Sequence, residues 1–217
     1  MKDIFLFGGG YHPNSVLEAI EKEGRYRVCG FVDWLDPLCS GKSFGVERIS
    51  KEKFLESKIR SGVVAINTNF MRAQLVEEII RECADFEFLT VIHPSAEIAR
   101  GVEISRGTVV LAGAILGADT KLGEHVIVNT RASIDHDCKV GNFASVLPGS
   151  TVCGQVEIGD YSAICAGAIV IHKRKIGAHT VIGAGSTVVT DIPEQVVAVG
   201  NPCRVIRSRA KDQRYLN

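Results

Sequence analysis

The sequence predicts a small α/β domain with a parallel sheet, followed by a longer all-β domain that is a parallel β-helix. Three observations lead to this prediction. Apolar strands alternate with amphipathic helices over residues 1–91, a strict six-residue repeat begins at Ile92, and neither half continues the pattern of the other. We therefore expect one domain over residues 1–91, a second over 92–195 and a C-terminal segment over 196–217.

The first domain is predicted from four short apolar runs and two helical patterns. Strands are expected at residues 4–7, 26–32, 63–66 and 88–92. The first helix is expected after a glycine-rich turn. Ser15 and Glu18 fit a capping box at its start, and Gly24 fits a stop at its C-terminal end. A second helix is expected over residues 71–83. Strands and helices that alternate at this spacing are typical of a parallel sheet.

The second domain is predicted from aliphatic residues that recur at every sixth position. A period of six fits neither the 3.6-residue helix nor the two-residue strand, and it indicates a stacked solenoid. Each hexad supplies one short strand with its aliphatic residue inward, and three hexads make one coil. Arg174 stands where most hexads have a small residue, so we expect a bulge or an outward-turned corner there. The inward positions, all Ile, Leu or Val, are Ile92, Ile98, Ile104, Val110, Leu116, Leu122, Val128, Ile134, Val140, Val146, Val152, Ile158, Ile164, Val170, Ile176, Ile182 and Val188.

The charge balance and the apolar segments limit the classes of function. Lys plus Arg and Asp plus Glu number 25 each, so the formal net charge is zero and no strong field favours nucleic acid or an anionic membrane. The N-terminal apolar run is too short for a signal peptide, and no stretch approaches membrane-spanning length, so we expect a cytoplasmic protein. Seven scattered cysteines without a CxxC pair argue against a disulfide framework and a zinc ribbon.

One histidine is a candidate catalytic base. His136 lies between Asp135 and Asp137, and a neighbouring carboxylate can hold an imidazole in one tautomer and make it a better base. The alternative is a surface histidine at a solvated corner. Gly154 follows one coil later, so it should lie at the same corner, roughly 4.8 Å along the axis by strand spacing. His172 lies two coils from His136, too far to share one zinc ion with it.

Five stretches carry a resemblance to a known family. They are FGGGYH at 7–12, FVDW at 31–34, IHPSAEI at 92–98, IDHDCKVGNFASVLPGSTVCGQVEIGD at 134–160 and GNPCR at 200–204. With these stretches the chain resembles the left-handed β-helix acyltransferases of the bacterial nucleotide-sugar group. That group contains sialic acid O-acetyltransferases and UDP-4-amino-sugar or GDP-perosamine N-acetyltransferases. The resemblance covers essentially the whole chain and implies a Rossmann-like first domain and a left-handed β-helix.

The resemblance also implies a chemistry. The expected function is an N-acetyltransferase that uses acetyl-coenzyme A, without a metal, to acetylate the amine of a nucleotide-linked amino sugar. His136 corresponds to the general base of the family, Asp137 to the acidic residue that raises its basicity, and Gly154 to the glycine whose N–H faces the thioester carbonyl. Family members are usually homotrimers with the active site between adjacent β-helices, so a homotrimer is expected.

The resemblance assigns two further sets of residues. A coenzyme A groove, completed by the C-terminal segment, would be formed by Ser145, Ala166, Ala184 and Arg204. Several relatives carry histidine at the position of Ser145. A basic cluster near the C-terminus would suit the 3′-phosphate of coenzyme A: Arg204, Arg207, Arg209, Lys211 and Arg214. The nucleotide or sugar of the acceptor would be held by Gly10, Tyr11, His12, Asp33, Trp34 and Asn67. Departures from the family pattern cluster in this last set, which leaves open an acceptor other than the common UDP sugars.

Three alternatives stay open. An O-acetyltransferase acting on sialic acid or another sugar would carry the same motif. A non-catalytic solenoid is disfavoured, because neither His136 nor the coenzyme A groove is lost. A metalloenzyme like the γ-carbonic anhydrases needs three converging histidines, and spacing within one chain gives no convincing trio among His93, His125, His136, His172 and His179.

Overall fold

The first part of the chain folds into a sheet with helices on both faces. The computed structural model describes residues 1–8, 10–34, 42–43 and 45–213. Within them the strands follow the order β3-β4-β2-β1-β5-β6, and only β3 and β4 pair antiparallel. The elements are β1 (Lys2–Phe7), α1 (His12–Glu23), β2 (Tyr26–Val32), β3 (Lys42–Ser43), β4 (Val46–Ile49), α2 (Lys51–Glu56), β5 (Ser61–Val64), α3 (Asn69–Glu82) and β6 (Glu87–Phe88).

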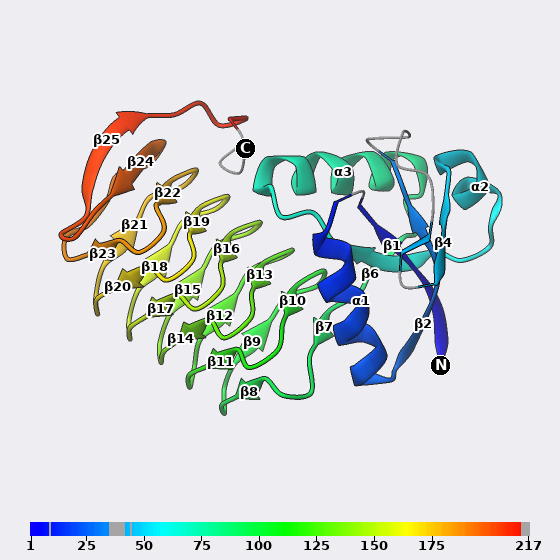
Figure 1. The fold of residues 1–217 in the computed structure, drawn as a ribbon, viewed down its shortest axis with the longest axis horizontal. Coiled ribbons are helices and arrows are strands. Elements are labelled where there is room, and N and C mark those ends of the chain that lie inside the picture. The colour runs from blue at the N-terminus through cyan, green and yellow to red at the C-terminus, as the bar shows by residue number, and fades with distance from the viewer. Residues whose placement is uncertain (9, 35–41, 44, 214–217) are drawn as a thin grey trace.

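Alternation along β1 explains why both faces of this sheet are covered. Ile4 and Leu6 are fully buried in one apolar cluster with residues of α1. Phe5 and Phe7 point to the other face, where they pack with Leu75 of α3. Successive side chains of a strand point to opposite faces, so one apolar strand can anchor two helices. Figure 1 shows α1 and α3 beside this sheet, with the β-helix extending away from it.

Two details of this part differ from the sequence prediction. Helix α1 begins at His12 rather than after Ser15, because Pro13 in the first turn has a backbone angle already suited to a helix. The predicted capping box is therefore wrong, and Tyr11 is the N-cap residue. Strand β4 and helix α2 were not predicted, since both are short. Helix α2 is capped by Ser50, whose hydroxyl accepts a hydrogen bond from the N–H of Lys53.

The second part is a parallel β-helix with three faces. Each predicted inward residue is the second residue of a two-residue strand, so the six-residue repeat is confirmed along its whole length. Ile98 is 38% exposed because it belongs to the open first coil. The strands are β7 (Val91–Ile92), β8 (Glu97–Ile98), β9 (Glu103–Ile104), β10 (Val109–Val110), β11 (Ile115–Leu116), β12 (Lys121–Leu122), β13 (Ile127–Val128), β14 (Ser133–Ile134), β15 (Lys139–Val140), β16 (Ser145–Val146), β17 (Thr151–Val152), β18 (Glu157–Ile158), β19 (Ala163–Ile164), β20 (Ile169–Val170), β21 (Lys175–Ile176), β22 (Val181–Ile182) and β23 (Thr187–Val188).

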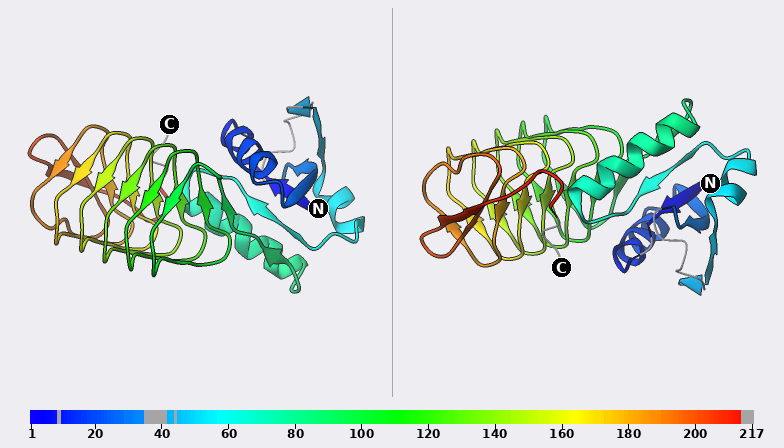
Figure 2. Two further views of the ribbon diagram at one scale, coloured as in Figure 1. Left: turned by 90° about the horizontal axis from the view of Figure 1, so that it is seen from below. Right: turned by 90° about the horizontal axis from the view of Figure 1, so that it is seen from above.

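Strands that stack on one another are 18 residues apart in the sequence. Ser133 of β14, for example, pairs with Thr151 of β17. Three stacks result, made of β7-β10-β13-β16-β19-β22, of β8-β11-β14-β17-β20-β23 and of β9-β12-β15-β18-β21. The views along other directions show the coils as a regular column (Figure 2). Residues in the same place of successive coils therefore lie next to one another.

The coil that contains Arg174 is regular. The carbonyl of Arg174 accepts the N–H of Glu157 at 3.0 Å, and β18 pairs with β21 without a register shift. The predicted bulge is therefore wrong. The side chain turns to the outside instead, where its Nη1 lies 3.6 Å from Oδ1 of Asp191.

The C-terminal end of the β-helix is closed by a hairpin. Strand β24 (Val196–Val199) pairs in parallel with β22, and β25 (Arg204–Ser208) pairs antiparallel with β24. The chain then runs back toward the first domain (Figure 1). Among the described residues, no helix has both the length and the apolar character needed to cross a membrane.

Candidate functional site

The candidate base lies at a corner of the β-helix, directly after β14. Nδ1 of His136 is 2.8 Å from Oδ2 of Asp137, and the side chains of both residues are about half exposed. The backbone N–H of His136 donates to Oδ1 of Asp135 at 2.8 Å. If Nδ1 carries the proton that Asp137 accepts, the lone pair of the imidazole is at Nε2. The structure thus joins the three residues of the Asp-His-Asp motif.

Gly154 lies against the ring of His136, one coil further along. A Cβ atom at position 154 would lie 2.6 Å from Nε2 of His136, closer than real Cβ contacts allow. The φ angle of Gly154 is outside the left-handed region, so the close approach of the ring, rather than backbone strain, makes a side chain unfavourable here. Among the described residues, the N–H of Gly154 has no hydrogen-bond acceptor. Gly154 is itself buried, so its unbonded amide lies beside the imidazole of His136.

The two carboxylates beside His136 change its acidity. The hydrogen bond to Asp137 raises the pKa of His136 above its ordinary value, and the negative charge of Asp135 adds to the increase. A raised pKa makes the neutral imidazole a stronger base. The site therefore places a candidate base of raised pKa beside a backbone amide that has no acceptor among the described residues.

A cavity in the first domain brings together all six residues that were assigned to the acceptor. Its volume is about 410 Å³, and it lies at the carboxyl ends of β1, β2 and β5 and at the N-terminus of α1. Ligands of open α/β sheets bind outside the carboxyl ends of the strands, where a helix N-terminus can take up negative charge. We call this cavity the acceptor pocket; its predicted residues are Gly10, Tyr11, His12, Asp33, Trp34 and Asn67.

Two residues at the entrance to α1 shape the acceptor pocket. The chain passes Ala65 so closely at Gly8 that an added Cβ would lie 2.8 Å from the Ala65 carbonyl oxygen. Nε2 of His12 is buried and has no hydrogen-bond partner among the described residues. Burial, and then the nearby charge of Arg72, lowers the pKa of His12 to about 3. His12 is thus a neutral hydrogen-bonding group in the wall of the pocket.

The wall formed by the end of β2 is held by contacts with other elements. Oδ2 of Asp33 accepts a hydrogen bond from Nη1 of Arg48 at 3.1 Å, and both side chains are mostly buried. Nε1 of Trp34 donates to Oε2 of Glu78 at 2.8 Å, and Nζ of Lys51 lies 4.6 Å from the centre of the indole ring. These contacts fix a carboxylate and an aromatic face at one end of the acceptor pocket.

Two of the four residues assigned to coenzyme A, Ala166 and Ala184, lie at a different corner, and a third, Arg204, lies in the closing hairpin. Ala166 and Ala184 are exposed on successive coils, where the N–H of Gly185 donates to the Ala166 carbonyl at 2.9 Å. Arg204 is exposed and opposite Val199 in the closing hairpin. This corner and the corner of His136 flank the same face of the β-helix, the face of β14, β17 and β20.

Ser145, the fourth residue, does not line a groove. Its side chain is fully buried, its Oγ donates to Oδ1 of Asn69 at 2.6 Å, and it accepts from Nη2 of Arg72 at 3.2 Å. Helix α3 covers this position, which argues against the predicted contact of Ser145 with coenzyme A. Arg209 is also mostly buried, with Nη1 donating to the His179 carbonyl, and Arg214 lies outside the described residues.

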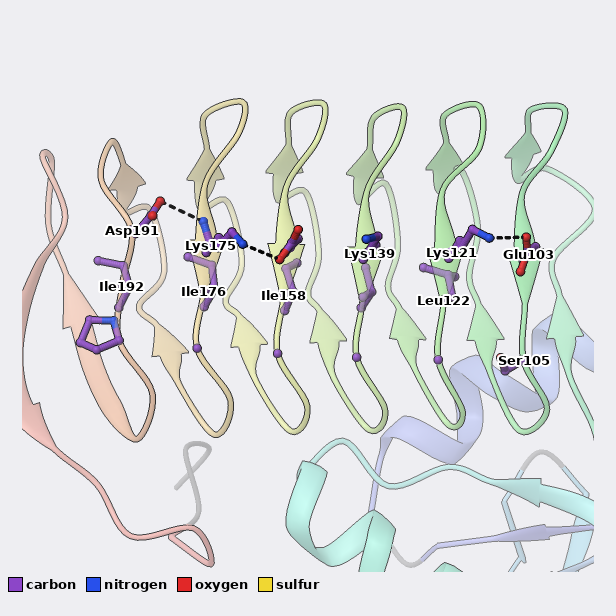
Figure 3. Close-up of a pocket in the computed structure, with 17 residues that line it drawn as sticks. Glu103, Ser105, Lys121, Leu122, Lys139, Ile158, Lys175, Ile176, Asp191 and Ile192 are labelled. Atoms are coloured by element: carbon purple, nitrogen blue, oxygen red, sulfur yellow. Dashed lines mark hydrogen bonds and ion pairs between the residues drawn. The ribbon is translucent and has the colours of Figure 1, made fainter.

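A wider groove of about 830 Å³ runs along the face of β9, β12, β15, β18 and β21 (Figure 3). Nζ of Lys121 lies 2.7 Å from Oε1 of Glu103, and Nζ of Lys175 lies 3.1 Å from Oε2 of Glu157. The described residues that line it include none of the predicted site residues. Across the described chain, His, Cys, Asp and Glu side chains form no group of three that could hold a metal ion.

Comparisons with known proteins agree with this architecture. A family model for the PglD N-terminal domain matches residues 3–79. The structure of PerB from Caulobacter crescentus in complex with CoA and GDP-perosamine is 33% identical, covers 95% of this chain and 98% of that one, and superposes with a TM-score of 0.87. The acetyltransferase domain of PglB from Neisseria gonorrhoeae, in complex with acetyl coenzyme A, is 31% identical, with 94% and 99% coverage and a TM-score of 0.86.

A third structure, a variant of the GDP-perosamine N-acetyltransferase from Caulobacter crescentus, is 32% identical over 96% of this chain and 98% of that one, with a TM-score of 0.89. No match was found among curated proteins by sequence comparison. The predicted fold, an α/β domain followed by a left-handed β-helix, is confirmed by these similarities. The chain belongs to the left-handed β-helix family of nucleotide-sugar acetyltransferases.

Proposed function

We propose that this protein transfers the acetyl group of acetyl-coenzyme A to the amino group of a nucleotide-linked amino sugar. The observation that carries the proposal is the pair formed by His136 and Gly154, in which an imidazole of raised pKa lies against a backbone N–H that has no acceptor among the described residues. Acyl transfer needs these two groups together, a base for the acceptor and a donor for the oxyanion. The relative with CoA and GDP-perosamine bound supports this choice of substrates.

The proposed reaction has one addition and one elimination. The amine nitrogen attacks the thioester carbon while Nε2 of His136 takes the proton that the nitrogen loses. The N–H of Gly154 donates to the oxygen that becomes negatively charged in the tetrahedral intermediate. The C–S bond then breaks, the amide carbonyl forms again, and His136 returns the proton to the sulfur of coenzyme A. Asp137 stabilises the imidazolium that exists between the two steps.

The acceptor pocket suits the nucleotide part of the acceptor. The N-terminus of α1 favours a diphosphate, the carboxylate of Asp33 can accept N–H groups of a base or sugar hydroxyls, and Trp34 offers an apolar wall. A neutral His12 adds one hydrogen bond without adding charge. A thiol-release assay with different nucleotide sugars identifies the base and the sugar that bind.

Coenzyme A would bind along the corner of Ala166 and Ala184, with Arg204 near its phosphates. Small residues at this corner leave room for the pantetheine arm, and an exposed guanidinium pairs well with phosphate. Because this corner and the His136 corner are separated by one face of the coil, we propose that two neighbouring chains of a homotrimer complete each site. The distribution of the site residues over separate corners supports an assembly of this kind.

A thiol-release assay tests the function. Acetyl-coenzyme A is supplied with UDP-, GDP- and dTDP-linked amino sugars and with free sialic acid, and the wild type is compared with His136→Ala. We expect turnover with one nucleotide amino sugar and a loss of about 10²–10⁴-fold in the variant, the usual contribution of a general base. An acetylated product that resists hydroxylamine is an amide, whereas a labile product is an ester and would show O-acetylation. The absence of both turnover and coenzyme A binding would disprove the proposal.

A further inference from the structure

Arg72 of α3 connects the acceptor pocket to the β-helix. Its side chain is fully buried between the two parts of the molecule. Nη1 donates to the carbonyls of Ile66 and Asn67, at 2.6 and 3.1 Å, and both residues line the acceptor pocket. Nε donates to the carbonyl of His125 at 2.9 Å, at a corner of the β-helix. One guanidinium therefore holds the pocket wall and the solenoid together.

The remaining nitrogen of Arg72 extends this link to the next coil. Nη2 donates to the carbonyl of Phe143 at 2.8 Å and to Oγ of Ser145 at 3.2 Å, and it lies 3.1 Å from Oδ1 of Asn69. His125 and Phe143 are 18 residues apart, so the two corners stack. The fixed fork of the guanidinium reaches both coils and the pocket wall at once, which a single ammonium group cannot do.

Asn69 makes a parallel connection to a third coil. Its Nδ2 donates to the carbonyl of Tyr161 at 3.0 Å and to that of Ser162 at 3.1 Å. Its Oδ1 accepts from both Arg72 and Ser145. Asn69 is 2% exposed, and neither it nor Arg72 is among the residues that line the acceptor pocket. Both residues can therefore influence the reaction without touching the acceptor.

The corners to which Arg72 and Asn69 donate hydrogen bonds carry a regular stack of side-chain rings. Rings at the same place of successive coils stack on one another, with centroids 5.0, 5.2 and 4.6 Å apart and planes within 17° of parallel. We call this set the aromatic ladder: His125, Phe143, Tyr161 and His179. The spacings are close to the distance between neighbouring strands, so the ladder rises with the backbone of the coils. The wall of the acceptor pocket is hydrogen-bonded through Arg72 and Asn69 to these corners, so the wall should move only together with the coils.

We propose that Arg72 and Asn69 are positioning residues that hold the acceptor pocket in fixed orientation to the β-helix that carries His136. The inference rests on the proposed function, because the orientation matters only if an acceptor in the pocket must reach the acetyl group. A displacement of about 1 Å in a reacting group can lower a rate about 100-fold, whereas the affinity of a pocket depends mainly on its own lining. The expected signature is thus a loss of kcat with little change in the KM of the acceptor.

Four variants test this proposal: Asn69→Ala, Arg72→Lys, Arg72→Met and, as a control, Arg60→Met. Arg60 is matched to Arg72, because it also donates to backbone carbonyls, but those of Leu55, Ser57 and Ile59 all belong to the first domain. Each protein is assayed with the best acceptor of the wild type for kcat, for the KM of the acceptor and for the Kd of coenzyme A, and its Tm is measured.

We expect Asn69→Ala and Arg72→Lys to lower kcat at least tenfold per folded enzyme, with the KM of the acceptor and the Kd of coenzyme A within about twofold of the wild type. Arg72→Met should lose more, and Arg60→Met should keep the wild-type kcat even where its Tm falls. A lower Tm with unchanged kcat in Asn69→Ala and Arg72→Lys would show a merely structural role and overturn the proposal.

A second measurement keeps the proposal separate from the proposed function. If the wild type turns over no acceptor, the proposed function is wrong. Hydrogen exchange of residues 66–69 then tests whether Arg72 and Asn69 hold the pocket wall in place. Faster exchange there in Asn69→Ala than in Arg60→Met would support it, and equal exchange would overturn it.

Discussion

The imidazole of His136 lies so close to Gly154 that the next coil of the β-helix has no room for a Cβ beside Nε2. The two residues are 18 positions apart and occupy the same corner. The proposed base and the proposed amide donor are therefore placed by the repeat itself. This arrangement gives several expectations that mutation can check.

Gly154→Ala should lower kcat more than tenfold with a small effect on stability. The added methyl group would lie 2.6 Å from Nε2, so the ring of His136 must turn away from the acceptor. The backbone of Gly154 accepts an alanine, because its φ is outside the left-handed region. Steady-state kinetics and a thermal melt measure both effects.

Gly24→Asn is the control for this substitution. Gly24 ends α1 with φ +72° and has no atom within 4 Å of an added Cβ, and asparagine is tolerated at such a left-handed cap. This position lies away from the corners of the β-helix, so kcat should not change. If Gly154→Ala kept the wild-type kcat, the close approach of the His136 ring to position 154 would not matter for the reaction.

Asp137→Asn should move the acidic limb of the pH profile of kcat/KM to lower pH. The hydrogen bond that His136 donates to Asp137 is the main cause of the raised pKa of His136, so its loss lets the pKa return toward the ordinary value. The imidazole then stays neutral at lower pH, but it becomes a weaker base and the plateau falls. The pH dependence of kcat/KM in free enzyme reports this pKa. Asp135→Asn, which removes only a neighbouring charge, should shift the limb less; an unmoved limb in Asp137→Asn would exclude His136 as the titrating group.

His125→Phe should stabilise the protein and reduce its sensitivity to acid. Both ring nitrogens of His125 are buried without a hydrogen-bond partner among the described residues, and the ring is stacked on Phe143 at 4°. Replacing it by an apolar ring removes a cost of about 1–3 kcal/mol for an unsatisfied buried polar group. Burial and the charge of Arg72 lower the pKa of His125 to about 3.

The sign of the pH effect follows from this lowered pKa. Between pH 6.5 and about 3 the unfolded chain binds a proton at residue 125 that the folded protein does not bind. Stability therefore falls as the pH falls, by about 1.4 kcal/mol per pH unit for each such histidine. Urea unfolding at pH 7, 6 and 5 should show a shallower decline in His125→Phe than in the wild type. An equal decline would place a proton on His125 in the folded protein.

Arg204→Ala should weaken the binding of coenzyme A about 10-fold and reduce its dependence on salt, because a charge-assisted contact to a phosphate is lost. Ser145→Ala should leave that affinity unchanged, since its hydroxyl is buried against Asn69. Calorimetric titration with coenzyme A at two salt concentrations compares the two variants. Weaker binding in Ser145→Ala would restore the contact that the structure argues against.

The sequence predicted correctly those features that depend on residues close together along the chain. Each strand of the β-helix needs only its own hexad, so a period of six predicts the column, and Gly154 is found beside His136 as the coil length requires. The acceptor residues also meet in one pocket, because the ends of neighbouring parallel strands lie at one edge of a sheet. Strand β4 and helix α2 were missed because four and six residues carry little periodic signal.

The contacts between the two parts could not be predicted from such local patterns. The family resemblance assigned Ser145 to the coenzyme A groove, yet α3 of the first domain covers this position. A signal for the covered face is present in the sequence. The outward residues of its strands are uncharged and buried, whereas those of another face are charged and mostly exposed. The first set is Val91, Val109, Ile127, Ser145, Ala163 and Val181, and the second is Glu103, Lys121, Lys139, Glu157 and Lys175.

The contacts of Arg72 and Asn69 with the β-helix all fall between His125 and Ser162. Coils after that point can be added or removed in steps of 18 residues, under the closing hairpin, without moving the wall that these two residues hold. The length of the solenoid is thus uncoupled from the geometry between acceptor and base. A chimera that exchanges only the coils after Ser162 would alter the corner where we propose that coenzyme A binds and leave the acceptor pocket intact, so the two specificities could diverge separately.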